Sequence, residues 1–354
     1  MQDKTFITPR SGRALVRKGA ALALTAGLAF AMLLSGCSAP APSAGSSASD
    51  ALVRTVKVGT MPTEDILPLW VAEQQDLFAA ADVAVEVIPF DSAPSLSAAI
   101  TAGQVDMAMT DIMRAVKLCE SGTDVTMEWI TLGATPEQGR FGIQVNGSSS
   151  VASLQDLVGL SVSVAANTVP EYVFDKLCEQ AGIDPATIAH EEVASLPERY
   201  ALMANGSAQS AALPGSLLAL GEAQGMRTIA DDASGENISQ SVMVARTAWA
   251  ADNAEVIEAV ASAWDAAVAL INEDPAAFRP LLVEKANLNS TIADGYPVSA
   301  YPLATKDGAA AEGATTLVRV PQQLVDPVLA WMTKKGYVEG AVTYDEETGT
   351  FTLA

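Results

Sequence analysis

The chain has 354 residues, of which 42 are acidic and 20 are basic, so its formal net charge is −22. A surface this acidic repels nucleic acid and anionic lipid headgroups, which argues against a nucleic-acid-binding protein. The length is enough for about two domains.

The first 36 residues predict a lipoprotein signal peptide. Five basic residues come first: Lys4, Arg10, Arg13, Arg17 and Lys18. The apolar stretch that follows, from Ala20 to Leu34, is shorter than a bilayer span requires. The quartet from Leu34 to Cys37 resembles the lipobox of bacterial lipoproteins, in which the cysteine is acylated and the chain is cut just before it. The alternatives are a plain secretory signal with an incidental cysteine, or an uncleaved anchor.

Residues 37–50 are expected to form a flexible tether. They hold small residues, proline and a single acid, and such a segment cannot bury enough surface to fold. Its mean reach would be about 20 Å. Without the leader the chain has 15 basic and 41 acidic residues, and no second apolar stretch of membrane-spanning length follows Cys37.

The body alternates strand and helix patterns, which predicts an α/β fold with mainly parallel sheets. In chain order, the first half predicts a strand at 55–59, a helix at 68–80, a strand at 83–87, a helix at 95–102 and a buried strand at 105–109.

A similar order recurs about a hundred residues later. The second half predicts a strand at 160–165, a helix at 170–181, a strand at 187–193, a helix at 196–204 and a strand at 208–213. Two similar α/β halves are what a two-lobed clamp would need.

Three further elements follow: a strand at 241–245, a long helix at 253–272 and a helix at 322–335 that stops at Gly336. Trp264 and Trp331 lie in the apolar stripes of these helices, which favours the core over a ligand platform.

Two cysteines lie in the body, Cys119 and Cys178, both on apolar-leaning faces of helix-like segments. A pair in an exported protein is compatible with a disulfide, but free cysteines are also among the most buried residues. The pattern favours two buried thiols.

Candidate ligand-binding residues lie where strands end, because the loops at the carboxyl ends of strands in open α/β sheets frame a crevice. In the first half they are Met61, Thr63, Glu64, Asp65, Asp91, Ser92, Thr110 and Asp111. In the second half they are Asn167, Thr168, Glu171, Tyr172, Pro214, Gly215 and Ser216. Trp70 and Arg140 complete the set. The hydroxyl and amide side chains among them could instead cap their own helices.

The charge of these loops leans toward an amino-substituted heterocycle, which would use carboxylate acceptors and an aromatic face. A sulfonate would need helix N-termini and at least one cation, and Arg140 is the obvious one.

Catalysis is not expected. The single histidine, His190, lies in a strand-like segment and is not paired with a serine or cysteine nucleophile motif. No His/Cys cluster has metal-ligand spacing, so neither a metal nor a cofactor is expected.

The order of several short phrases resembles the bacterial ABC-importer binding lipoproteins that serve sulfonates, nitrate, taurine and thiamine-precursor pyrimidines. The matching phrases are VKVG at 56–59, VEVIPF at 85–90, AGQVD at 102–106, DLVG at 156–159 and WMTKKG at 331–336. The resemblance extends from residue 54 to about 345.

The resemblance implies a type II periplasmic-binding-protein-like fold, with two α/β lobes joined by a hinge of two crossing strands. Lobe 1 would comprise residues 51–141 plus 246–354, and lobe 2 residues 142–245. The crossings would be 140–143 and 242–244. The family usually has an acid where Gly215 stands, which leaves the ligand class open.

The resemblance further implies an extracytoplasmic solute-binding protein that is anchored by lipid on the outer face of the cytoplasmic membrane. Its partners would be a small-molecule ligand and the permease and ATPase of an importer, with the chain itself a monomer that binds no nucleic acid. The alternatives are a surface lipoprotein that senses a ligand without transport, and a pyrimidine-synthesising enzyme of the same fold. The fungal enzyme carries a compact Cys-rich motif, and this chain has nothing comparable.

Overall fold

The computed structural model describes residues 55–133, 138–233, 238–288, 296–308 and 316–354. The predicted signal peptide and tether, including Cys37, lie outside the described residues. Residues 51–354 form one compact unit. None of the helices in the described ranges is long and apolar enough to cross a membrane.

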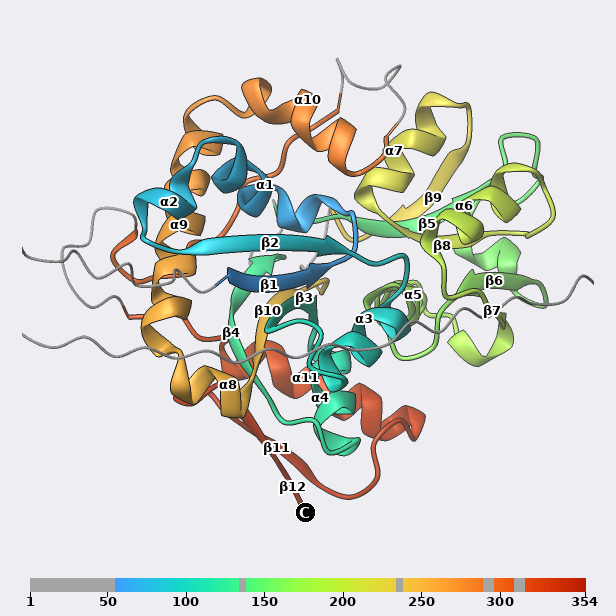
Figure 1. The fold of residues 1–354 in the computed structure, drawn as a ribbon. Coiled ribbons are helices and arrows are strands. Elements are labelled where there is room, and N and C mark those ends of the chain that lie inside the picture. Colours follow the sequence, from blue (N-terminus) through green and yellow to red (C-terminus); the bar gives the residue numbers. More distant parts are fainter. Residues whose placement is uncertain (1–54, 134–137, 234–237, 289–295, 309–315) are drawn as a thin grey trace, which may run out of the picture. The chain divides into compact units, whose positions relative to one another are not determined.

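The first sheet has the strand order β2-β1-β3-β10-β4 (Figure 1). Its strands are β1 (Thr55–Thr60), β2 (Ala84–Pro89), β3 (Met107–Asp111), β4 (Val125–Leu132) and β10 (Ser241–Arg246). β1 pairs in parallel with β2 and β3, whereas β10 runs antiparallel between β3 and β4. The sequence predicted that lobe 2 extends to residue 245. Ser241–Arg246 instead pairs inside the first sheet, so residues 241–245 belong to lobe 1.

Helices cover both faces of this sheet (Figure 1). On one face lie α1 (Leu67–Gln74), α2 (Leu77–Ala80), α9 (Ala254–Glu273) and α10 (Pro275–Lys285). On the other lie α3 (Ala93–Thr101), α4 (Ile112–Glu120) and α11 (Gln322–Lys335). The remaining elements are the 3₁₀ turn η1 (Glu64–Ile66), α8 (Thr247–Asp252) and the hairpin β11 (Val342–Asp345) and β12 (Thr350–Leu353).

The second sheet has the order β7-β6-β8-β5-β9. Its strands are β5 (Phe141–Val145), β6 (Ser161–Val164), β7 (Ala189–Glu192), β8 (Ala211–Pro214) and β9 (Arg227–Asp231). The helices of this lobe are α5 (Val169–Gln180), α6 (Leu196–Ala204) and α7 (Gly215–Ala223), with 3₁₀ turns η2 (Leu154–Leu157) and η3 (Pro185–Thr187). Each sheet contains a set of parallel strands and, next to it, one strand that runs antiparallel: β10 in the first sheet and β5 in the second. The repeat seen in the sequence therefore corresponds to two similar lobes. The expected α/β fold with two lobes is confirmed.

The chain passes between the lobes twice, after β4 and after β9. The first passage ends where β5 begins at Phe141, close to the expected crossing. The second ends before β10, so the expected crossing at 242–244 lies in the middle of a strand of the first sheet instead. A run of apolar residues does not show which of two sheets it joins, because a strand buried in either one has the same composition.

The main core continues from one lobe into the other. Val162, Tyr172 and Phe174 of lobe 2 belong to the same buried cluster as Ala115 and Trp331 of lobe 1. The rings of Tyr172 and Trp331 meet edge to face, 5.2 Å apart.

The expected core positions are confirmed for the tryptophans and cysteines. Trp264 and Trp331 are buried, as predicted from their helical stripes. Cys119 and Cys178 are both buried free thiols, and burial raises the pKa of each.

Candidate functional site

A cavity of about 50 Å³ lies between the lobes, with room for only a few water-sized groups. Lobe 1 contributes the ends of β1 and β3, and lobe 2 contributes the ends of β6 and β8. The first residues of α3, α5 and α6 also line it. This is the place where open α/β sheets hold ligands, because their loops and free helix N–H groups gather at the carboxyl ends of the strands.

Lobe 1 brings two buried carboxylates to the cavity wall. Asp65 accepts hydrogen bonds from the hydroxyls of Ser241, at 2.5 Å, and Thr63. Asp111 caps α4 by accepting the N–H of Arg114 at 2.7 Å. Burial raises the pKa of Asp65, and it raises the pKa of Asp111 to about 6, because taking a carboxylate out of water favours its neutral form.

Lobe 2 brings a buried cation, Arg199 on α6, which is 1% exposed and lines the same cavity. Its guanidinium donates to the carbonyls of Val193, at 2.9 and 2.8 Å, and Ala212, at 2.9 Å. In the part of the chain that the structure describes, no carboxylate forms an ion pair with it. Burial lowers the pKa of Arg199 to about 10, although the charge of Glu192 acts in the opposite direction.

Glu64 connects the two lobes beside the cavity. Both of its carboxylate oxygens accept the N–H of Ser216, at 3.2 Å each, in the first turn of α7. A Cβ added at Gly215 would lie 2.7 Å from Glu64 Oε1, so glycine allows this approach. Burial, together with the charge of Asp65, raises the pKa of Glu64 to about 7. The family usually has an acid at the position of Gly215. Here a carboxylate also reaches the N-terminus of α7, but it belongs to Glu64 of lobe 1.

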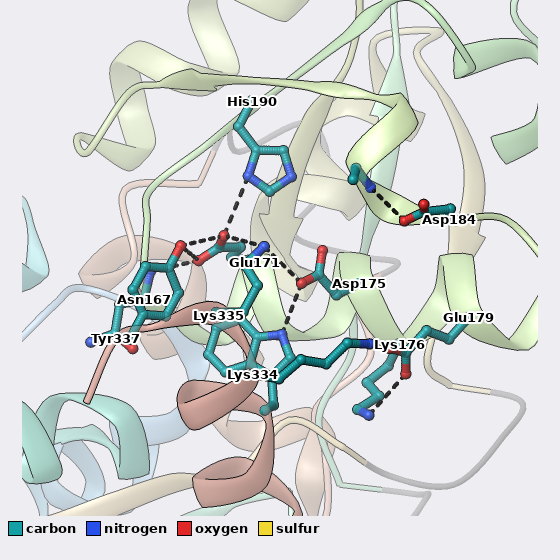
Figure 2. Close-up of polar contacts among 12 residues, drawn as sticks. Asn167, Glu171, Asp175, Lys176, Glu179, Asp184, His190, Lys334, Lys335 and Tyr337 are labelled. Atoms are coloured by element: carbon teal, nitrogen blue, oxygen red, sulfur yellow. Dashed lines mark hydrogen bonds and ion pairs between the residues drawn. The ribbon is translucent and has the colours of Figure 1, made fainter. Parts of the chain in front are cut away.

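A second connection joins α5 of lobe 2 to α11 and the segment after it (Figure 2). Lys335 lies 3.0 Å from Glu171 and 2.9 Å from Asp175, and the hydroxyl of Tyr337 donates to Glu171 at 2.6 Å. Trp331 Nε1 donates to Asp175 at 2.8 Å. We call this set of contacts the α5–α11 seam.

Glu171 is the centre of the seam and is fully buried. It also accepts the N–H of Asn167 at 2.6 Å and lies 3.3 Å from Nδ1 of His190 (Figure 2). Burial alone would raise the pKa of Glu171, but the hydrogen bonds from His190, Tyr337 and Asn167 outweigh it and hold the pKa at about 2. His190, an exposed residue of β7, therefore lies beside a structural carboxylate.

Arg140 is engaged within lobe 2. Its guanidinium forms ion pairs with Glu222 at 2.8 Å and with Asp231 at 2.9 Å, and these contacts raise its pKa against the opposing effect of burial. Arg140, the cation that we expected near the hinge, is thus already neutralised by two carboxylates.

Of the 17 candidates named from the sequence, the structure brings seven together in the cavity wall: Met61, Thr63, Asp65, Thr110, Asp111, Thr168 and Pro214. The other ten do not line it: Glu64, Trp70, Asp91, Ser92, Arg140, Asn167, Glu171, Tyr172, Gly215 and Ser216. Trp70 and Tyr172 are buried in the cores. The alternative of helix capping, raised for hydroxyl and amide side chains, applies to Ser92, which accepts a backbone N–H at the start of α3. Asp111, for which capping was not expected, does the same at the start of α4.

Sequence reasoning missed Arg199, Ser241 and Phe141 among the lining residues. One signal was available for Arg199, because it lies two residues after Pro197 in a short helix that follows a strand. A basic residue in the first turn of such a helix lies at the same sheet edge as the strand-end loops. Within the described residues, no group of His, Cys, Asp and Glu could hold a metal ion.

Comparison with known proteins agrees with this arrangement. The family model described as "NMT1/THI5 like" matches residues 63–278, more than half of the chain. No curated protein is significantly similar in sequence.

Solved structures share the fold at low sequence identity. The alkanesulfonate-binding protein SsuA from Xanthomonas axonopodis pv. citri, bound to MOPS, aligns with a TM-score of 0.65 at 14% identity, covering 80% of this chain and 92% of that one. The periplasmic nitrate-binding protein NrtA from Synechocystis PCC 6803 gives 0.64 at 14% identity, covering 82% and 83%. DSZB in complex with biphenyl-2-sulfinic acid gives 0.56 at 13% identity, covering 80% and 93%.

Proposed function

Because this chain belongs to the NMT1/THI5-like family, we propose that it is the extracytoplasmic solute-binding component of an ABC importer. It captures a small polar organic nutrient, either sulfonate-like or resembling a thiamine-precursor pyrimidine. The observation that carries the proposal is the cavity between two lobes, whose wall combines strand ends and helix starts from both. The structural likeness to sulfonate-binding and nitrate-binding proteins supports it.

The proposal includes the membrane partners. A permease and an ATPase receive the ligand, and the chain is held at the outer face of the cytoplasmic membrane by lipid on Cys37. The chain acts as a monomer and needs no cofactor, because capture requires only that ligand contacts form between two lobes.

Capture would work by closure. A ligand that touches both walls binds the closed form better and shifts the population toward it. Two contacts across the gap, from Glu64 to Ser216 and from Arg114 to the carbonyl of Ala166 at 3.3 Å, would break if the lobes separated. These contacts and the small cavity are what a closed arrangement would have.

A thermal-shift panel of pyrimidines, sulfonates, nitrate and related molecules tests the proposal. A true ligand stabilises the folded state by about 2.7 kcal/mol at a hundred times its dissociation constant, so one class should respond clearly. X-ray scattering should then show compaction with the responder. A rise in melting temperature without compaction would contradict a clamp.

Transport is tested separately from binding. Cells that lack this chain should lose uptake of the responding molecule, and uptake should return when the chain is restored. Unchanged uptake would assign the chain to ligand sensing without transport. Chemical conversion of the responder by the purified protein would instead show an enzyme.

A further inference from the structure

The turn between β6 and α5, residues 165–168, forms part of the lobe 2 wall of the cavity. Ala165 and Thr168 line the cavity, together with the first two residues of α5. Asn167 has a φ of 55°, in the left-handed region that a residue other than glycine adopts only at a cost in free energy. The shape of this wall therefore depends on the contacts that hold the turn.

Glu171, in the first turn of α5, holds the turn from within lobe 2. Its carboxylate accepts the backbone N–H of Asn167 at 2.6 Å (Figure 2). An acidic side chain at the third position of a helix commonly reaches back to an N–H group at the helix start in a similar way. Taken alone, this contact would be a local cap that needs nothing from lobe 1.

The same carboxylate is also held from lobe 1, by two residues of the α5–α11 seam. Lys335 lies 3.0 Å from it, and the hydroxyl of Tyr337 donates to it at 2.6 Å (Figure 2). Within the described ranges, Lys335 is the one lysine or arginine that forms an ion pair with Glu171. Because Glu171 is fully buried, its charge needs such partners to remain where the Asn167 N–H can reach it.

We infer that Glu171 is a positioning residue for capture, which holds the 165–168 turn in its cavity-lining shape only while Lys335 and Tyr337 of lobe 1 contact it. This rests on the proposed capture function and makes its closure step more specific. When the lobes separate, Glu171 loses its ion pair and its hydroxyl donor, and its charge turns toward water instead of toward the Asn167 N–H. Closure of the lobes therefore also completes the wall that receives the ligand.

Hydrogen exchange at the Asn167 amide tests the inference on the full chain. Lys335→Met combined with Tyr337→Phe removes both contacts of lobe 1 with Glu171. Exchange at Asn167 should become at least about tenfold faster in this double variant, since a hydrogen bond to a charged group contributes that much. Tyr337→Phe alone, the milder change, should shift the exchange in the same direction. Amides of β8 are the internal reference, because a general loss of stability would speed their exchange as well.

A matched double variant is the control. Lys334→Met removes another ion pair between α11 and α5, with Glu179 at 3.0 Å. Tyr344→Phe removes another tyrosine hydroxyl of lobe 1, which donates to the carbonyl of Val320 at 2.9 Å. Neither contact involves Glu171, so the combined control should leave exchange at Asn167, relative to β8, within about twofold of the unmodified protein.

Binding is then measured by isothermal titration. The probe is whichever of ethanesulfonate, nitrate and 4-aminopyrimidine raises the melting temperature of the unmodified protein. Its affinity should fall at least about tenfold in Lys335→Met/Tyr337→Phe and stay within about twofold in Lys334→Met/Tyr344→Phe. None of the four substituted residues lines the cavity, so a loss in the first variant alone would come through the turn.

Three results separate the possible failures. Equal exchange at Asn167 in the two double variants would show that Glu171 is a local cap, and would overturn the inference while leaving capture intact. Faster exchange with unchanged affinity would also overturn it, because the turn would then not position the wall for a ligand. If the unmodified protein binds none of the probes and no other member of the thermal-shift panel, both the inference and the proposed function fail.

Discussion

Replacing Glu64 with glutamine should change how the stability of the ligand-free protein depends on pH. The folded chain holds the Glu64 proton with a pKa of about 7, whereas the ordinary value is 4.5. A carboxyl whose pKa is raised on folding stabilises the folded state fully below its unfolded pKa, and this stability is lost as pH rises through the folded pKa. Between about pH 5 and about pH 8, linkage assigns a loss of roughly 2.5 kcal/mol to this one group.

Glutamine keeps the size of the side chain and can still accept the Ser216 N–H, but it does not titrate. The free energy of unfolding of Glu64→Gln should therefore fall less than that of the unmodified protein over this pH range, by about 2.5 kcal/mol. Urea denaturation at several pH values measures the difference. Glu86→Gln, at an exposed position on β2, is the control and should follow the unmodified profile. Parallel profiles for Glu64→Gln and the unmodified protein would refute the reasoning.

Three other perturbations test the rest of the molecule. Glu171→Gln should lower the free energy of unfolding by about 3 kcal/mol at neutral pH in urea denaturation, because it removes the charge of a fully buried carboxylate that the partly buried Lys335 and Tyr337 of the α5–α11 seam contact. Glu179→Gln, which loses only exposed ion pairs, should cost about 1 kcal/mol or less, and equal effects of the two would contradict a role of the seam in stability. Denatured but unreduced mature protein should expose the thiols of Cys119 and Cys178 to a thiol reagent, whereas finding neither would show a disulfide. Cys37→Ala should release soluble or unprocessed protein from membranes, and a variant that stays membrane-bound with unchanged gel mobility would disprove the lipobox.

Much of the fold could be predicted because local patterns are strong here. The helices at 196–204 and 322–335 have the bounds expected from the sequence. Ser195 caps the first by accepting a backbone N–H, and Gly336 ends the second in the left-handed conformation that glycine adopts without strain. These signals act within a few residues, so they are readable without tertiary structure.

Choosing candidates at the carboxyl ends of strands identified part of the cavity wall. Asp65, Thr110 and Asp111 line the cavity, because the ends of β1 and β3 meet at one edge of the first sheet. This choice could not find Arg199, which lies inside a helix. Nor could it show that Arg140 is occupied, since its carboxylate partners are more than 80 residues away in sequence.

The sequence by itself determined the α/β pattern, the two repeated halves and the acidic strand ends, because propensity, capping and hydrophobic periodicity depend on near neighbours. Only the tertiary structure decided which acids line the cavity and which form contacts between the lobes. Glu64 and Glu171 look like Asp65 and Asp111 in sequence, yet the first binds an N–H 152 residues away and the second a hydroxyl 166 residues away. A carboxylate binds the donors that folding brings to it, and in an α/β protein those donors come from strands and helices distant in the chain.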